Sequence, residues 1–350
     1  MKDIDTLLKE VKRIHFIGIG GSGMCPLAEI LLSLGYQLSG SDNNDTETFR
    51  RIEKEGAKVY LGQTKANLTP DIQLVIYTNA ILKGNEELEW AKTHYPCFER
   101  AELLGAMSRI FSNCIGISGT HGKTTTTYLL KAILEQELGA KVGLIGTNQD
   151  LIGDEVVPTE RTTPESLELQ ELFARMRSAG CTHVVMEASS HALALDRVYG
   201  IHYAVGIFTN LTQDHLDFHK TMEAYCDAKA ILFQNCDVGV CNADDPWTER
   251  LLQNAACRQY FYAEHAAADL RAEHITLAAD HIAFDAVTKD SRTPIKVGIP
   301  GGFMVYNTLD VLGAALALGV PLEKSARVLA AVPHVKGWKW SPHRERTTRS

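Results

Sequence analysis

Residues 119 to 125 read GTHGKTT, a run of glycines, threonines and a lysine whose residue types and spacing suit phosphate binding. The glycines let backbone N–H groups close around phosphate oxygens, and Lys123 can reach the terminal phosphates of a nucleotide. Thr124 then stands where a hydroxyl would hold Mg²⁺. The eight-residue form of this loop needs a glycine where the chain has Ile117, so we predict a shorter nucleotide-binding variant. A structural turn that happens to contain GKT is the alternative.

A strand and a helix must flank such a loop if it is to bind phosphate. The apolar run Cys114 to Ser118 predicts the strand, and TTYLLKAILEQ after the loop predicts the helix. The N-terminus of that helix adds a partial positive charge. Two more apolar runs, VVMEA at 184–188 and VGIFTN at 205–210, are typical of parallel strands covered on both faces.

Polar side chains follow these two runs, at the sheet edge where such folds carry their chemistry. Glu187 follows VVM, and NLTQDHLDFH at 210–219 follows VGIF. A carboxylate and His215 at neighbouring strand ends beside a phosphate loop suit Mg²⁺ binding. The structural alternative is that Glu187 caps a helix and His215 forms a hydrogen bond within a loop.

A second glycine-rich turn lies near the N-terminus. The strand Arg13–Ile17 precedes GIGGSG at 18–23, a helix runs to about Leu34, and Asp42 ends the next strand. This spacing is typical of a dinucleotide-binding unit, in which an acidic residue about 20 positions on binds a ribose hydroxyl. It fits NAD, a nucleoside diphosphate or a tight strand-to-helix turn. Further strands at 57–60, 74–78 and Cys97, with helices at 46–55 and 86–94, predict a β/α domain that ends near Ser112.

Composition limits the class of protein. A length of 350 residues with 45% hydrophobic side chains predicts two or three globular domains. The net charge of −8 and the lack of a basic stripe argue against a nucleic-acid partner. The eight cysteines are scattered singly, which is typical of reduced thiols. No run approaches 18 apolar residues and the N-terminal segment is charged, so we predict a cytoplasmic protein without a membrane span, and a monomer.

Five segments in order resemble the Mur ligases, the ATP-dependent amide-forming enzymes of peptidoglycan precursor synthesis. They are GTHGKTT, RTTPESLELQ at 161–170, MEASSHALALDRV at 186–198, TNLTQDHLDFH at 209–219 and YCDAKAILF at 225–233. The central motifs are most similar to the branch that adds the third amino acid, meso-diaminopimelate or L-lysine, to UDP-N-acetylmuramoyl-L-alanyl-D-glutamate. The segments HFIGIGGSGMCPLAEILLSLGYQLSGSD and FERAELLGAMSR instead resemble the UDP-binding domain of the alanine-adding branch.

The resemblance implies a mechanism and a set of ATP and metal contacts. ATP phosphorylates the free carboxylate of the substrate, and the amine of the incoming amino acid attacks the acyl phosphate. The implied ATP contacts are Gly119, Thr120, His121, Gly122, Lys123, Thr124, Thr125 and Asn307. The implied metal ligands are Thr124 and Glu187 for one Mg²⁺, His215 for a second, and Lys229, which is carbamylated in this family. Lys123, Lys229 and His215 are the implied catalytic residues.

Two of these residues have structural alternatives. Lys229 could be a surface lysine on the helix predicted over Met222 to Phe233, and Asn307 could cap the helix that follows it. On the substrate side, the implied contacts to the muramoyl peptide are Thr162, Thr163, Ser189 and Arg197, and those to the uridine diphosphate are Gly20, Ser22, Gly23 and Asp42. NAD is then unnecessary. Leu195 stands where some members of this branch have glutamine, so one hydrogen bond is lost there.

The resulting architecture is α/β. We predict a Rossmann-like UDP-binding domain at 1–112, a P-loop-type ATP-binding domain with a mainly parallel sheet at 113–333, and an irregular tail at 334–350. The third domain of the family, which would select the amino acid, is expected to be absent. The tail ends GWKWSPHRERTTRS, and codons for the family-like continuation MEVVPTPGKDYTV can be chosen so that a shifted frame reads Trp338 to Ser350. We therefore hypothesise a frameshift near Lys336.

Three classes of function follow. The first is a Mur ligase that adds the third amino acid, expected to lack turnover as this chain, with the alanine-adding ligase as its enzymatic rival. The second is a non-catalytic protein that binds a UDP-sugar or ATP. The third is an NAD-dependent oxidoreductase built on GIGGSG, which titration with the cofactor would separate.

Overall fold

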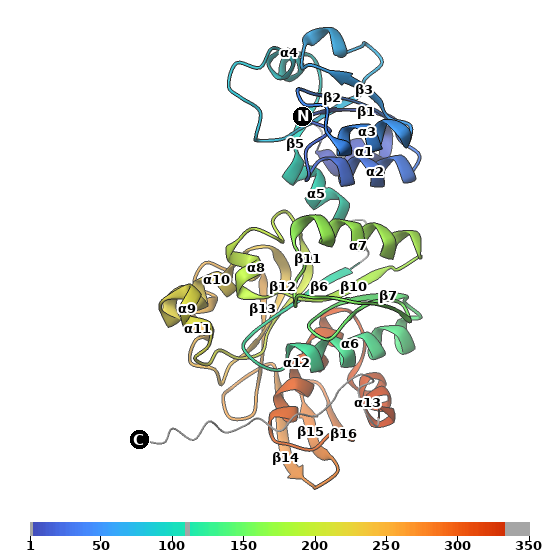
Figure 1. Cartoon of the computed structure of the whole chain (residues 1–350). Coiled ribbons are helices and arrows are strands. Elements are labelled where there is room, and N and C mark those ends of the chain that lie inside the picture. The colour runs from blue at the N-terminus through green and yellow to red at the C-terminus, as the bar shows by residue number, and fades with distance from the viewer. Residues whose placement is uncertain (1–2, 109–112, 333–350) are drawn as a thin grey trace.

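The computed structural model describes residues 3–108 and 113–332, whose strands form two separate sheets (Figure 1). A five-stranded sheet contains the N-terminal strands, and an eleven-stranded sheet contains the rest. Helices pack on both sheets, so the predicted α/β class is confirmed. Both the boundary predicted at Ser112 and the tail predicted at 334–350 lie outside the described residues.

The first sheet is parallel and has the order β3-β2-β1-β4-β5. Its strands are β1 (Arg13–Ile17), β2 (Gln37–Asp42), β3 (Lys58–Leu61), β4 (Leu74–Tyr77) and β5 (Cys97–Glu99). The helices around it are α1 (Ile4–Glu10), α2 (Cys25–Ser33), α3 (Glu47–Lys54), the 3₁₀ helix η1 (Lys65–Asn67), α4 (Glu86–His94) and α5 (Arg100–Ser108). The strand order changes direction between β1 and β4, and ligands of such sheets bind beside that point.

Local chemistry explains where these helices begin. Thr46 caps α3, because its hydroxyl accepts a hydrogen bond from the Phe49 amide at 3.2 Å, and Asn85 caps α4 through the Leu88 amide at 2.9 Å. The second glycine-rich turn is followed by α2, which begins at Cys25 with Pro26 in its first turn. The strands and helices predicted in this part of the chain are confirmed to within a few residues, whereas α1, η1 and α5 were not predicted.

The second sheet has the order β16-β15-β14-β13-β12-β11-β6-β10-β7-β8-β9. Its strands are β6 (Asn113–Ser118), β7 (Val142–Ile145), β8 (Asp150–Ile152), β9 (Glu155–Val157), β10 (His183–Glu187), β11 (Tyr203–Phe208), β12 (Cys236–Asn242), β13 (Arg258–Ala263), β14 (Leu270–Leu277), β15 (Ile282–Val287) and β16 (Arg292–Val297). The strands from β14 to β7 pair in parallel, and antiparallel strands extend both edges. The prediction of a mainly parallel sheet is therefore confirmed.

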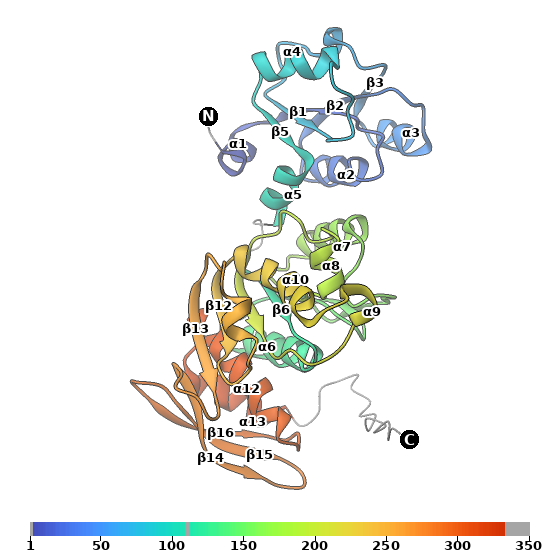
Figure 2. The ribbon, with the colours of Figure 1, turned by 90° about the vertical axis from the view of Figure 1, so that its left-hand side faces the viewer.

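Two apolar cores cover the two faces of this sheet. Helices lie on both faces (Figures 1 and 2). On one face lie α6 (Lys123–Leu138), α12 (Phe303–Ala317) and α13 (Leu322–Ala331). On the other lie α7 (Ser166–Ser178), α8 (Ser190–Ala194), α10 (Met222–Gln234) and α11 (Thr248–Leu251), with α9 (Leu216–His219) beside α10. Burial on both faces explains why β6, β10 and β11 are almost uniformly apolar.

The two parts of the chain are in contact where α7, which packs on the second sheet, lies against α2, which packs on the first (Figure 2). A methyl group on Gly200, which follows α8, would come within 2.6 Å of the Ala101 carbonyl oxygen in α5, so the two parts of the chain approach closely there as well. Within residues 3–108 and 113–332, no helix is long and apolar enough to cross a membrane.

Candidate functional site

The predicted phosphate loop joins the end of β6 to the start of α6. Gly119 has φ +155° and Gly122 has φ +90°, which L side chains rarely adopt, and α6 begins directly after Gly122. A Cβ atom on Gly119 would overlap Thr209 Oγ1, and one on Gly122 would overlap Asn307 Oδ1. The loop is therefore enclosed by the end of β11 and by α12, and both glycines are required by close approach as well as by backbone conformation.

Asn307 is placed against this loop from far along the chain. It lies inside α12, buried, whereas Gly302 occupies the N-cap position of that helix. The alternative in which Asn307 caps a helix is therefore wrong. Its amide oxygen faces Gly122, at the N-terminus of α6.

Hydrogen bonds from neighbouring residues hold the phosphate loop in this conformation. The Thr120 amide donates to the Asn210 carbonyl oxygen at 2.9 Å, and the His121 amide donates to Asn210 Oδ1 at 3.0 Å. Lys123 Nζ donates to the carbonyl oxygens of Gly119 at 2.9 Å and Thr120 at 3.0 Å. Burial lowers the pKa of Lys123, and the charges of Glu187 and Asp214 oppose that shift. A desolvated lysine satisfied only by carbonyl oxygens suits an incoming anion.

Glu187 ends β10 and is buried beside the loop. Its Oε1 accepts hydrogen bonds from Thr124 Oγ1 at 2.8 Å and from the Thr147 amide at 3.0 Å, and its Oε2 accepts from Thr147 Oγ1 at 2.9 Å. Ser189, not Glu187, caps α8, since its hydroxyl accepts from the Ala192 amide. The alternative in which Glu187 caps a helix is therefore wrong, and two of the predicted metal ligands are in direct contact.

Lys229 also reaches the loop. Its side chain is buried in α10, and its Nζ donates to the Gly119 carbonyl oxygen at 2.8 Å and lies 4.5 Å from the centre of the Tyr225 ring. The interpretation of Lys229 as a surface lysine is therefore wrong. Burial lowers its pKa well below the usual value, and the neighbouring charge of Lys123 adds to the shift.

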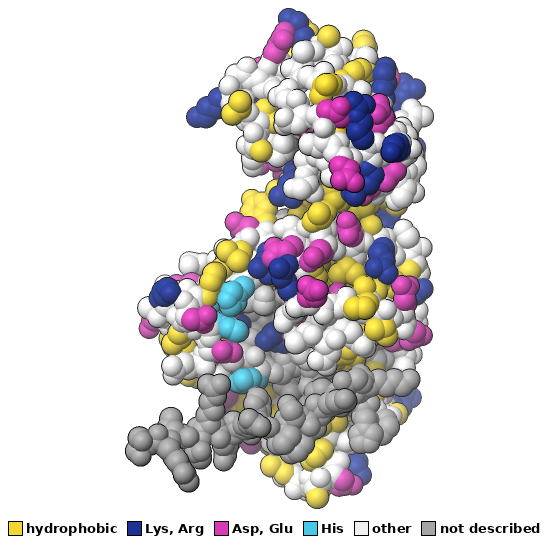
Figure 3. Space-filling model, viewed as in Figure 1, with side chains coloured by type: hydrophobic (Ala, Val, Ile, Leu, Met, Phe, Trp, Pro, Cys, Tyr) yellow, Lys and Arg dark blue, Asp and Glu magenta, His cyan; other side chains and the backbone are white. Residues whose placement is uncertain are grey.

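His215 lies apart from Glu187 in its described contacts. It is half-exposed, its Nε2 lies 3.5 Å from Asp214 Oδ2, and its ring centre is 4.9 Å from that of His191 and 6.0 Å from that of Tyr225. Histidine side chains gather on this side of the second sheet, over α8 to α10 (Figure 3). Within the described residues, no group of at least three His, Cys, Asp or Glu side chains could hold a metal ion.

The oxygen atoms at Thr124 and Glu187 nevertheless suit Mg²⁺. Mg²⁺ prefers hard oxygen ligands, and in nucleotide sites it takes only one or two from the protein and the rest from phosphate and water. A hydroxyl and a carboxylate 2.8 Å apart at the N-terminus of α6 meet that requirement. The described geometry is compatible with one such ion at this point, and both this site and a second ion at His215 stay predictions.

The residues predicted to contact the muramoyl peptide surround Glu187. Thr162 Oγ1 lies 3.0 Å from Thr147 Oγ1, and the buried Thr163 hydroxyl donates to the Glu187 carbonyl oxygen at 2.7 Å. The Ser189 amide donates to the Thr163 hydroxyl at 3.0 Å. Thr163 therefore holds the end of β10 in place through its own hydroxyl.

Arg197 follows α8 and is mostly buried. It forms an ion pair with Glu165 at 2.9 Å. Its Nε is buried and has no hydrogen-bond partner among the described residues. The guanidinium thus keeps one buried donor that no described residue satisfies.

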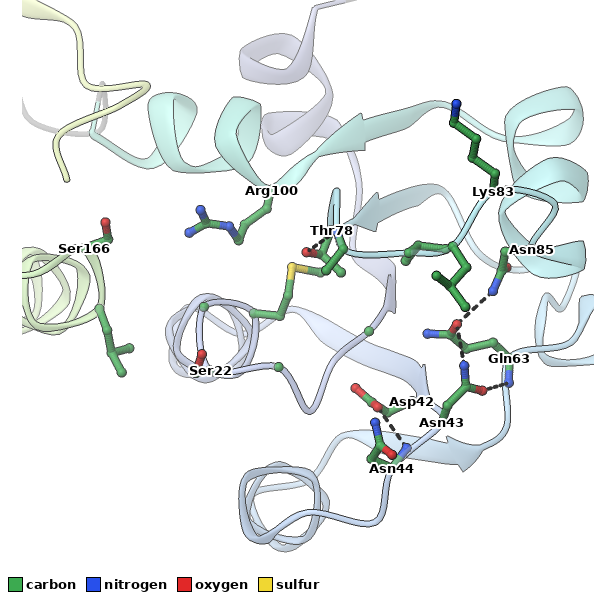
Figure 4. A pocket seen from close by; sticks show the side chains of 18 of the residues that line it. Ser22, Asp42, Asn43, Asn44, Gln63, Thr78, Lys83, Asn85, Arg100 and Ser166 are labelled. Carbon is green, nitrogen blue, oxygen red and sulfur yellow. Dashed lines mark hydrogen bonds between the residues drawn. The ribbon is translucent and has the colours of Figure 1, made fainter. Parts of the chain in front are cut away.

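The second glycine-rich turn lines a cavity of about 800 Å³ (Figure 4). Of the four residues predicted to contact uridine diphosphate, Ser22, Gly23 and Asp42 lie on its wall, whereas Gly20 does not. The Gly20 amide instead donates to Asp42 Oδ2 at 3.0 Å and so holds the carboxylate of Asp42 in place.

Other residues of this cavity were not predicted. Arg100 of α5 and Ser166 of α7 line it from the side of the second sheet, and Asn43, Gln63 and Asn85 form a hydrogen-bonded group of amides on the opposite wall (Figure 4).

Thr147, Thr209 and Asn210 were likewise missing from the predicted ATP site. Each of these three follows the carboxyl end of a buried parallel strand, and that position was the available signal.

Comparisons with known proteins identify relatives of both parts of the chain. Residues 117–315 match the family described as "Mur ligase middle domain", and residues 13–112 match "Mur ligase family, catalytic domain". A UDP-N-acetylmuramoyl-L-alanyl-D-glutamate–2,6-diaminopimelate ligase of Clostridium botulinum is 47% identical over 223 residues, which are 64% of this chain and 46% of that protein. The ligase of the same name from Listeria monocytogenes serotype 4b is 40% identical over 232 residues, 64% of this chain and 47% of that protein.

Solved structures share the fold. A structure of a UDP-N-acetylmuramoyl-L-alanyl-D-glutamate–2,6-diaminopimelate ligase has a TM-score of 0.61 at 23% identity and covers 85% of this chain and 60% of its own. MurF from Acinetobacter baumannii has a TM-score of 0.55 at 17% identity, with 88% and 63% covered. The chain spans about half the length of the curated relatives that it matches. Since the middle-domain match alone covers more than half of these 350 residues, the chain belongs to the Mur ligase family.

Proposed function

We propose that the protein is an ATP-dependent ligase that adds diaminopimelate to UDP-N-acetylmuramoyl-L-alanyl-D-glutamate in cytoplasmic peptidoglycan precursor synthesis. The curated relatives at 40–48% identity carry this activity in their names, which favours diaminopimelate over L-lysine. The single observation that carries the proposal is the hydrogen bond between Thr124 and Glu187 beside the phosphate loop. This hydrogen bond joins the N-terminus of α6 to the end of β10. The predicted substrate contacts lie near that end of β10.

Within this proposal, residues 113–333 form a P-loop-type ATP-binding domain. The phosphates of ATP lie along the loop from Gly119 to Thr125, with Asn307 against its end, and the Lys123 ammonium exchanges its carbonyl partners for phosphate oxygens. Thr124 and Glu187 hold Mg²⁺, which neutralises phosphate charge when bound. Positioning and charge neutralisation are the main demands of phosphoryl transfer, and these side chains supply both.

Residues 1–112 form the Rossmann-like domain that binds uridine diphosphate. The cavity beside Ser22, Gly23 and Asp42 receives this part of the substrate, and Arg100 faces the diphosphate from α5. The peptide then extends towards Arg197 and Ser189, close to the end of β10. Its terminal carboxylate thereby reaches the phosphate loop.

Lys229 is expected to react with CO₂. Burial and the charge of Lys123 lower its pKa, so its amine is more often neutral than that of an exposed lysine. The neutral nitrogen bonds to the carbon of CO₂ and releases a proton, which leaves a carbamate anion beside the Gly119 end of the phosphate loop. Native mass spectrometry in bicarbonate should show the added mass of one CO₂ on the protein, and Lys229→Arg should abolish it. An unmodified protein in saturating bicarbonate would contradict this assignment.

Glycine at position 122 is expected to be required for ATP binding. In Gly122→Ala, the methyl group meets Asn307 Oδ1 and the backbone is strained at φ +90°. Gly139→Ala is the matched control, because Gly139 ends the same helix at φ +61° with open space around it. Both variants should lose about 1–2 kcal/mol of unfolding free energy from backbone strain. In calorimetric titrations with MgATP, only Gly122→Ala should bind weakly, and equal binding by both variants would show that the contact with Asn307 is unimportant.

Binding preference tests the proposed function. We expect the protein to bind UDP-N-acetylmuramoyl-L-alanyl-D-glutamate at least about tenfold more tightly than UDP-N-acetylmuramate, since the dipeptide adds one net carboxylate as a second anionic partner for Arg197 beside Glu165. Calorimetric titration of both nucleotides in the presence of MgATP measures the difference. Tighter binding of UDP-N-acetylmuramate would favour the alanine-adding ligase. Thermal stabilisation by NAD instead of either nucleotide would favour an oxidoreductase.

A further inference from the structure

A buried polar cluster lies inside the first sheet, away from the phosphate loop. His15 and Glu87 have no exposed surface, and His15 Nε2 lies 3.0 Å from Glu87 Oε1. Glu87 Oε1 also accepts from Asn67 Nδ2 at 3.1 Å, and its Oε2 accepts from Ser41 Oγ at 2.6 Å. Ser39 Oγ lies 2.8 Å from the other ring nitrogen of His15. One carboxyl group thus binds side chains from β1, β2 and η1 at once.

Stability alone does not account for this cluster. Removing a carboxyl group and an imidazole from water carries a large desolvation cost, and apolar residues of similar volume commonly fill such a space without loss of stability. Buried apolar residues share this face of the sheet, as Ile17 of β1 and Val75 of β4, the partner of His15, show. A buried polar cluster whose members are all satisfied instead fixes one arrangement of the segments that carry them.

The loops next to these hydrogen-bonded residues form one wall of the cavity beside Asp42. Gln63 Oε1 accepts from Asn85 Nδ2 at 2.8 Å and from Asn43 Nδ2 at 3.1 Å, and the Gln63 amide donates to Asn43 Oδ1 at 3.2 Å (Figure 4). These three residues, Asn43, Gln63 and Asn85, are called the amide wall below. They come from three loops that are far apart in the sequence, and all three line the cavity.

Each residue of the amide wall lies one or two positions along the chain from Glu87 itself or from a residue that hydrogen bonds connect to Glu87. Ser41, which donates to Glu87, precedes Asn43 by two positions. Asn67, which also donates to Glu87, donates in addition to the carbonyl oxygen of Gly62 at 2.9 Å, directly before Gln63. Asn85 caps the helix α4 in which Glu87 lies two positions later.

We propose that Glu87, supported by His15, is a positioning residue that holds the amide wall in the arrangement that binds the nucleotide end of the substrate. The inference rests on the proposed function only in taking the cavity as the uridine diphosphate site. Glu87 has no exposed surface and acts through Asn43, Gln63 and Asn85. Preorganised polar side chains lower the entropy cost of binding, so loosening them weakens affinity without removing a contact.

The test is calorimetric titration with UDP as the probe and MgATP as the internal reference. Glu87→Ala should weaken UDP binding at least about tenfold and leave MgATP binding within about twofold. Glu87→Gln should bind UDP within about threefold of the original protein, because its amide oxygen still accepts from His15 and Asn67 and the Ser41 hydroxyl can rotate to accept. Ser41→Ala, which removes one donor and leaves Glu87 in place, covers the case in which Glu87→Ala does not fold.

The control separates positioning from stability. Ile52 is fully buried in α3 in the same part of the chain and does not line the cavity, so Ile52→Ala lowers stability without touching the cluster. Weak UDP binding by Glu87→Ala or Ser41→Ala, with normal UDP binding by Ile52→Ala, supports the proposal. Equal UDP affinity in all variants overturns it, and so does equal weakening in Ile52→Ala. If the unaltered protein binds MgATP but not UDP, the cavity assignment is wrong and this inference fails with it, whereas the ATP site stands.

Discussion

Replacing Lys123 with alanine should weaken MgATP binding at least about 30-fold, since removing one partner of a buried, charge-assisted contact costs about 2–5 kcal/mol. The Lys123 ammonium is desolvated at the N-terminus of α6, and among the described residues it is bonded only to the carbonyl oxygens of Gly119 and Thr120. A phosphate group would be its first anionic hydrogen-bond partner, so the contact should contribute strongly. Calorimetric titration with MgATP measures the loss.

The matched control for this prediction lies on the same helix. Lys131 is also buried in α6 and forms an ion pair with Glu135, two turns away from the loop. Lys131→Ala removes a lysine of the same helix without altering the proposed site, so MgATP binding should stay within about twofold, since substitutions at separate sites without shared partners act nearly independently. Comparable losses in both variants would mean that Lys123 acts only through the stability of α6.

Replacing Glu187 with glutamine should remove most of the effect of Mg²⁺ on ATP binding. The buried carboxylate touches the Thr124 hydroxyl and two groups of Thr147, and the amide of glutamine keeps a similar shape without the charge. We expect affinity for MgATP to fall at least about tenfold, as is typical for altered metal sites, whereas affinity for ATP in the presence of a chelator should change little. Titrations with and without Mg²⁺ give the two values.

Asp150 supplies the control for the Glu187 variant. It is a second buried carboxyl group at the same end of the second sheet, where it accepts from the Gly146 amide at 3.1 Å, and burial raises its pKa to about 6. Asp150→Asn keeps that acceptor, so the Mg²⁺ dependence of ATP binding should be unchanged. If ATP binding no longer depends on Mg²⁺ in either variant, the substitutions have changed the sheet edge in general. If ATP binding still depends on Mg²⁺ in Glu187→Gln, Glu187 is not part of the metal site.

Local patterns in the sequence were sufficient to predict most of the fold near the site. The strands β6, β10 and β11 are buried on both faces, so apolar and polar side chains need not alternate along them. The resulting continuous apolar runs can be recognised directly in the sequence. The phosphate loop could be placed because glycine, lysine and threonine are required within seven consecutive residues. The antiparallel strands β8, β9, β15 and β16 are short or exposed on one face, and their patterns are weaker.

The remaining features depend on contacts between distant segments. Asn307 and Gly122 are far apart in the sequence, and only the packing of α12 on α6 brings them together. Lys229 has the sequence surroundings of an exposed helical lysine, yet α10 turns it towards the Gly119 carbonyl oxygen. The amide wall arises in the same way, from three loops joined by one buried carboxyl group. Residue types alone contain no signal for such pairings.

A crystal structure of the protein with MgATP and UDP-N-acetylmuramoyl-L-alanyl-D-glutamate would show directly where both substrates bind. We expect the terminal phosphates of ATP at Lys123, Mg²⁺ at Thr124 and Glu187, and the uridine in the cavity beside Asp42. The glutamate carboxylate of the dipeptide should then point at the terminal phosphate. ATP in the cavity beside Asp42, or a muramoyl dipeptide that points away from the phosphate loop, would contradict the assignment of both sites.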